Sequence, residues 1–89
     1  MNHQPSLIEI KEMTPEKAIS FLNIVISEDR DNEEAIILRG MKHWALNHRQ
    51  EAINDFLTAL KINPDGKAKT ALELTNSIMD YYNKDLYNP

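Results

Sequence analysis

Residues 36–64 read IILRGMKHWALNHRQEAINDFLTALKINP, and the spacing of small and bulky residues in this stretch predicts the fold. Gly40 and Ala52 are small enough for two antiparallel helices to cross closely, and Phe56 fills the space beside the crossing. Pro64 ends the second helix, because proline cannot donate the backbone hydrogen bond that a helix interior requires. The stretch therefore predicts two antiparallel helices joined by a short turn.

Together with Ala59, which leaves room for the helix of a following unit, these residues resemble one tetratricopeptide repeat, a helix–turn–helix unit of about 34 residues. The chain departs from the family pattern at three places. The family prefers a bulky aromatic at Ile36, an aliphatic residue at Arg39 and an aromatic at His43. The resemblance implies an all-α fold of antiparallel helix–turn–helix repeats, a fragment of an α–α superhelix, and it implies a protein-binding scaffold.

A shift of the chain by about 34 residues aligns it with itself, which is the signature of stacked repeats. The aligned pairs are Ala18 with Ala52, Ile19 with Ile53, Leu22 with Phe56, Val25 with Ala59, and Ile26 with Leu60. Residues 15–28 are therefore interpreted as the second helix of an earlier unit. The chain then holds about one and a half repeats and a closing helix, and the resemblance covers roughly residues 14–82.

Local sequence signals predict where the helices begin and end. Thr14 followed by Pro15 is a helix start, Asp31 with Glu34 forms a capping-box pattern, and Asn47 suits the left-handed end of a helix. The expected helices are 15–28, 32–46, 49–62 and 67–83, with a turn at 64–66. In the helix over 32–46 we expect a solvated side formed by Arg39, Lys42 and His43.

The chain divides into three expected parts: an N-terminal arm or short helix (1–13), a single helical domain (14–84) and a C-terminal tail (85–89). The alternation in Leu7–Ile10 is compatible with a strand, but no second strand candidate exists to pair with it. A short helix or an ordered arm is therefore favoured there.

Composition excludes several classes of function. The 89 residues carry 14 acidic and 10 basic side chains, a net charge of −4. This balance argues against nucleic acid and against an anionic membrane surface as partners. The chain has no cysteine, no signal-peptide pattern and no apolar run of membrane-spanning length, so a cytoplasmic location is expected.

No catalytic, cofactor-binding or metal-binding residue is expected. His43 and His48 are five residues apart and do not share a face of a continuous helix, and no carboxylate completes a metal site. Serines lack a base at a meaningful spacing, and the two glycines, Gly40 and Gly66, form no phosphate-binding loop. The sequence therefore predicts a protein that is not an enzyme.

The resemblance places one helix face toward a concave groove. In the family the first helix of each unit lines that groove, which here implies a stripe with counterparts in the closing helix: Ile37, Met41 and Trp44, and then Ala71, Thr75 and Ile78. We expect this face to bind a protein or peptide, with Trp44 as the anchor. The alternative is that the stripe is core, covered by residues 15–28 or by the arm at 6–12.

A second alternative function is self-association. The first unit lacks most of its own first helix, which leaves one flank of residues 15–28 uncovered. Phe21 and Ile24 add apolar surface to that helix. A homodimer that covers this flank is then the runner-up to the binding of a foreign peptide.

Overall fold

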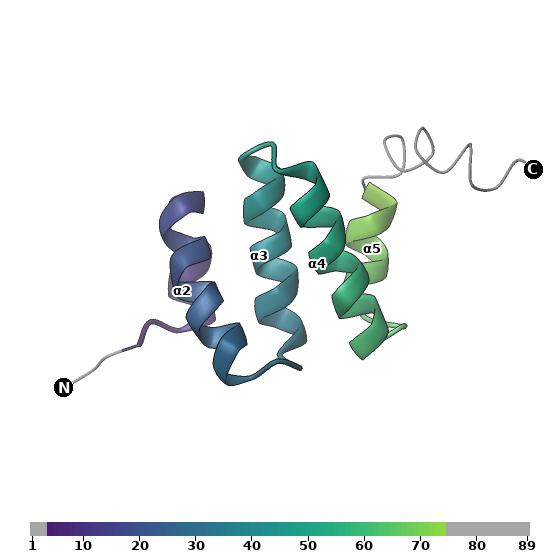
Figure 1. Ribbon diagram of the computed structural model, residues 1–89, viewed down its shortest axis with the longest axis horizontal. Coiled ribbons are helices and arrows are strands. Elements are labelled where there is room, and N and C mark those ends of the chain that lie inside the picture. The colour runs from purple at the N-terminus through teal and green to yellow at the C-terminus, as the bar shows by residue number, and fades with distance from the viewer. Residues whose placement is uncertain (1–3, 75–89) are drawn as a thin grey trace, which may run out of the picture.

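The computed structural model describes residues 4–74, which form five α-helices and no strand. The helices are α1 (Leu7–Lys11), α2 (Pro15–Glu28), α3 (Glu33–Ala45), α4 (Arg49–Ile62) and α5 (Lys67–Leu74). Helices α2 to α5 stand side by side in chain order (Figure 1). The predicted all-α fold is confirmed. The predicted part of the last helix after residue 74 and the predicted tail at 85–89 lie outside the described residues.

Helix α1 begins with a capping box. The Ser6 hydroxyl accepts a hydrogen bond from the Glu9 amide at 3.2 Å, and the Glu9 carboxylate accepts one from the Ser6 amide at 2.8 Å. Two backbone donors that would otherwise be unsatisfied at the helix start are thereby paired. Residues 7–10 are consequently helical rather than extended, and Ile10 is fully buried.

The predicted caps are partly wrong. Thr14 does precede Pro15 at the start of α2, but its side chain makes no capping hydrogen bond. The cap of α3 is Asn32 and not Asp31: the Asn32 side-chain oxygen accepts from the Ala35 amide at 3.1 Å. The amide of Asp31 instead donates to the Asp29 carboxylate at 3.3 Å and forms a turn before the helix. Helix α3 therefore begins at Glu33, one residue later than predicted.

Helix boundaries recur along the chain at the expected period. Each pair of equivalent boundaries is separated by 34 residues: Pro15–Glu28 and Arg49–Ile62, the starts Glu33 and Lys67, and the ends Lys11 and Ala45. The packing positions recur with them, because Ala18 and Leu22 of α2 are buried like Ala52 and Phe56 of α4. The periodicity inferred from residue types is thus also a periodicity of the backbone.

Helix α3 lies between two apolar clusters. One joins α3 to α4 and α5 and consists of Ile36, Ile37, Ala52, Phe56, Ala59 and Ala68. The other joins α3 to α1 and α2 and consists of Ile10, Ala18, Leu22, Ala35 and Leu38. The broad apolar arc of α3 follows from this double packing, since a helix with neighbours on two sides must be apolar over most of its circumference.

Gly40 of α3 lies directly against side chains of α4. A Cβ atom at this position would stand 2.6 Å from Cε1 of Phe56 and 3.1 Å from Cβ of Asp55. The predicted close crossing therefore involves Phe56 and Asp55 directly, with Ala52 fully buried in the same helix. A larger residue fits here only if the Phe56 ring or one of the two helices moves.

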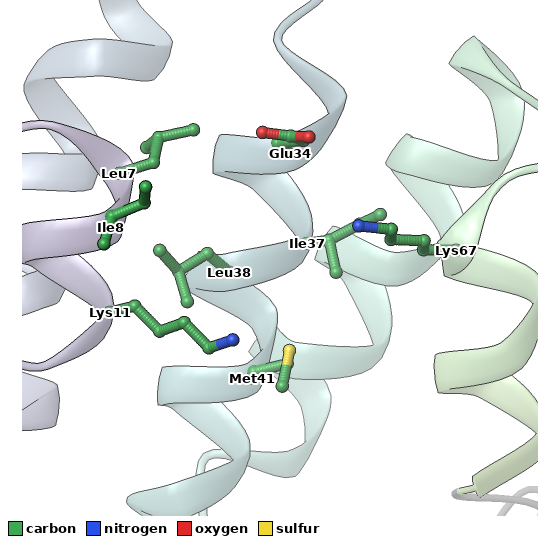
Figure 2. A pocket seen from close by; sticks show the side chains of 8 residues that line it. All are labelled: Leu7, Ile8, Lys11, Glu34, Ile37, Leu38, Met41 and Lys67. Atoms are coloured by element: carbon green, nitrogen blue, oxygen red, sulfur yellow. The ribbon is translucent and has the colours of Figure 1, made fainter.

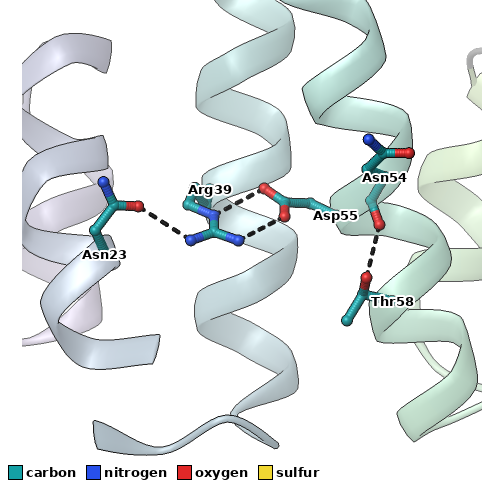
Figure 3. A network of polar contacts seen from close by, with 5 residues as sticks. All are labelled: Asn23, Arg39, Asn54, Asp55 and Thr58. Atoms are coloured by element: carbon teal, nitrogen blue, oxygen red, sulfur yellow. Dashed lines mark hydrogen bonds and ion pairs between the residues drawn. The ribbon is translucent and has the colours of Figure 1, made fainter. Parts of the chain in front are cut away.

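The prediction of a solvated side formed by Arg39, Lys42 and His43 is wrong, because all three side chains are only partly exposed. The Arg39 guanidinium donates to both oxygens of Asp55, at 2.9 and 2.8 Å, and to the side-chain oxygen of Asn23 at 3.0 Å (Figure 3). The hydrogen bonds to Asp55 and its negative charge raise the pKa of Arg39, against the opposing effect of burial. Asp55 is only 6% exposed, so a paired guanidinium is what makes its burial tolerable. Arg39 thereby connects α2, α3 and α4.

Lys42 fixes the end of α1 to α3. Its ammonium donates to the backbone carbonyl of Lys11 at 2.7 Å and to that of Met13 at 3.1 Å. Carbonyls at a helix C-terminus lack partners within the helix, and a lysine is a suitable donor for them. The short α1 helix is thus held in place by one cation as well as by Ile10 in the core.

Candidate binding groove

A groove runs across α3 between α1 and α5. Its first recess has a volume of about 430 Å³ (Figure 2). It is lined by Leu7, Ile8 and Lys11 of α1, by Glu34, Ile37, Leu38 and Met41 of α3, and by Lys67 of α5. The volume lies within the range of about 300–1,000 Å³ that is typical of ligand pockets.

A second recess of about 460 Å³ lies toward α4 and α5. It is lined by Ile37, Met41, Trp44, Phe56, Lys67, Thr70 and Ala71. Because Ile37, Met41 and Lys67 belong to both recesses, the two are adjoining parts of one depression. We call this combined feature the α3 groove.

Four of the predicted site residues come together in the α3 groove: Ile37, Met41, Trp44 and Ala71. The other two, Thr75 and Ile78, lie outside the described residues. Phe56, Thr70 and the α1 residues were not predicted as lining residues. No local pattern marks them, because they enter the groove only through the packing of α1, α4 and α5 around α3.

The predicted stripe is divided between core and surface. Ile37 is 7% exposed and belongs to the core cluster, so it forms the floor of the α3 groove. Met41, in contrast, is 50% exposed and lies at the surface. Trp44 is half-buried and packs against that cluster. Helix α2 does not line the groove, and the α1 residues stand at its edge. Met41 is therefore buried neither by residues 15–28 nor by the arm at 6–12, the two segments that could have covered it.

Trp44 is held in position from the start of α4. The guanidinium of Arg49 lies over the indole ring, 4.4 Å from its centre, and its Nε donates to the Asn47 side chain at 2.9 Å. A cation over an aromatic face stabilises both groups by about 0.5–1 kcal/mol at exposed sites. The indole is thereby preorganised at one end of the α3 groove.

Charge in the α3 groove is opposite to that of the whole chain. Lys11 and Lys67 stand on opposite sides of the first recess, and Glu34 is its one acidic lining residue (Figure 2). No ion pair is found for either lysine side chain within residues 4–74. The chain carries a net charge of −4, so the apolar floor is bordered by a local excess of positive charge.

The expectation that His43 and His48 lie apart is wrong. Their Nδ1 atoms are 3.3 Å apart, and their ring centres are 5.5 Å apart. The spacing argument applied to a continuous helix, but α3 ends between them. Within the described part of the chain, no group of three or more histidine and carboxylate side chains is placed to hold a metal ion.

No protein family model matches the chain, and no curated protein or solved structure matches it. In the described residues, none of the helices combines the length and the apolar character needed to cross a membrane.

Proposed function

We propose that this protein is a non-enzymatic protein–protein interaction module of tetratricopeptide type, which binds a segment of a partner protein in the α3 groove. The observation that carries the proposal is the half-exposed Met41 in the middle of a mostly apolar groove. Methionine is common on surfaces that bind peptides, because its flexible, polarizable side chain adapts to different apolar partners. The half-buried Trp44 beside it is the expected anchor.

The regular recurrence of helix boundaries supports the repeat type. Units that stack on one another expose equivalent faces, and such arrays bind partners along extended concave surfaces. Binding of this kind needs no cofactor. We also propose a cytoplasmic location, for which a chain without cysteine is suited.

The charges in the groove indicate the chemistry of the occupant. A segment with two or more large apolar side chains would fill the recesses over Ile37 and Met41. Acidic residues flanking those side chains would lie near Lys11 and Lys67. Complementary charges increase specificity and the association rate more than they increase affinity. We therefore expect a partner segment that is apolar in its centre and acidic at its edges.

A peptide-display selection on the purified protein tests this function. We expect the recovered sequences to be enriched in large apolar residues together with Asp or Glu. The selected peptides should lose affinity for a Lys11→Glu/Lys67→Glu variant. Enriched peptides that are basic, or that bind the charge-reversed variant equally well, would contradict the proposed chemistry.

Substitutions in the groove locate the binding site. Met41→Glu places a negative charge in the middle of the groove at a half-exposed position, and we expect it to abolish capture of the selected peptides while helix content by circular dichroism stays unchanged. Trp44→Ala should also abolish capture. The matched control is Leu57→Glu, since Leu57 is 40% exposed but lies outside the groove. Retained binding by Met41→Glu would exclude the groove.

The exposed flank of α2 favours self-association as a second candidate function. Phe21 is half-buried against the core, while Ile24 is 48% exposed. If the protein forms a homodimer through this flank, light scattering should give twice the monomer mass, and Ile24→Glu should restore the monomer. A monomeric mass for the unsubstituted protein at high concentration would exclude this candidate.

A further inference from the structure

The turn between α3 and α4 brings two histidine side chains together. The amide of His48 donates to the carbonyl of His43 at 2.8 Å, and the amide of Asn47 donates to that of Trp44 at 2.9 Å. Asn47 has a left-handed φ of 65°. This is the hydrogen-bond pattern of a Schellman motif, in which the first and last residues of the turn usually make an apolar side-chain contact. Here both positions are histidine.

The distance between the two imidazoles suits a shared metal ion. The Nδ1 atoms are 3.3 Å apart, with the ring planes inclined by 44°. Two nitrogens bound tetrahedrally to Zn²⁺ at about 2.0–2.1 Å lie about 3.3–3.4 Å from each other. The two nitrogens therefore already lie at the separation found between two ligands of one metal ion.

A neutral imidazole whose ring nitrogen has a free lone pair is the form that ligates metals. Asp55 is already engaged by Arg39, so it is not available as a third ligand.

We propose that His43 and His48 form a two-histidine site for a divalent transition metal ion such as Zn²⁺, with both Nδ1 atoms as ligands and water in the remaining positions. In the neutral metal-free pair, one Nδ1–H donates to the other Nδ1. Metal binding needs both Nδ1 lone pairs, so that proton moves to Nε2 of the same ring. The neutral pair thus changes tautomer without net release of a proton.

Isothermal titration of the full chain with Zn²⁺ near neutral pH tests the site. We expect saturable binding that His43→Gln and His48→Gln each weaken by about tenfold or more. His3→Gln is the matched control, since His3 is the third histidine of the chain, and it should bind as the unsubstituted protein does. Absence of saturable binding by the unsubstituted protein, or binding by either His→Gln variant that is as tight as that of the unsubstituted protein, would overturn the proposal.

Imidazole nitrogen chemical shifts provide a second measurement that does not depend on a change in stability. Addition of Zn²⁺ should shift the Nδ1 resonances of both His43 and His48 to values typical of a metal ligand and leave Nε2 protonated. Coordination through Nε2, or a shift of only one of the two rings, would contradict a shared site. Circular dichroism of the two variants verifies that the fold is retained.

Discussion

Gly40→Leu is expected to destabilise the protein by about 3 kcal/mol or more, the upper end of the cost of overpacking a core. The reason is geometric, because the first added carbon alone would lie 2.6 Å from Phe56 and 3.1 Å from Asp55. Phe56 is almost fully buried and cannot move aside without displacing the cluster between α3, α4 and α5. The backbone of α3 or α4 must then shift.

Thermal unfolding measures this effect. For a domain of this size, each kcal/mol lowers the melting temperature by roughly 4–8 °C. The matched control is Ala45→Leu, which adds the same kind of side chain to an exposed position of the same helix. Substitutions at such positions usually change stability by less than about 0.5 kcal/mol. Equal melting temperatures for the two variants would refute the close packing at Gly40.

Arg39→Met is expected to cost about 3 kcal/mol, because it leaves the Asp55 carboxylate buried without a cationic partner. This value is the lower end of the usual range for breaking a buried pair, since the Arg39 side chain is 24% exposed and water reaches part of the site. The loss should appear as a lower denaturant midpoint with an unchanged slope.

The double variant Arg39→Met/Asp55→Leu separates the cost of an unpaired charge from the value of the pair itself. Replacing both partners of a buried pair with apolar residues is often neutral or stabilising. We therefore expect the double variant to recover most of the stability that Arg39→Met loses. The single variant Asp55→Leu completes the comparison. If the double variant loses as much stability as Arg39→Met and Asp55→Leu lose in total, Arg39 and Asp55 do not interact.

These two sites also position the α3 groove. Gly40 sets how closely α4 approaches α3, and Arg39 connects α3 to its neighbours on both sides. The groove residues Ile37, Met41 and Trp44 lie on the same helix. A shift of α3 would therefore change the groove, so peptide capture should be measured only for variants whose helix content is retained.

The helices themselves followed from local sequence. Pro15 at a helix start, Asn47 at a left-handed helix end and the apolar spacing of residues 49–62 act over a few neighbours, so they can be recognised in a single chain. The small residue at Gly40 was also recognisable, because close helix packing has a strict steric requirement. These signals were sufficient for the all-α fold, whereas the helix face that carries Ile37, Met41 and Trp44 was implied by the resemblance to the tetratricopeptide repeat.

The tertiary structure alone decided which polar side chains meet. Arg39 and Asp55 are 16 residues apart in different helices, so the polar pattern of α3 suggested solvent where an ion pair exists. His43 and His48 meet because the chain reverses direction between them. Lys11 and Lys67 border one groove because α1 and α5 pack on either side of α3. Side-chain type predicts whether a residue prefers water, whereas its partner depends on how distant segments pack.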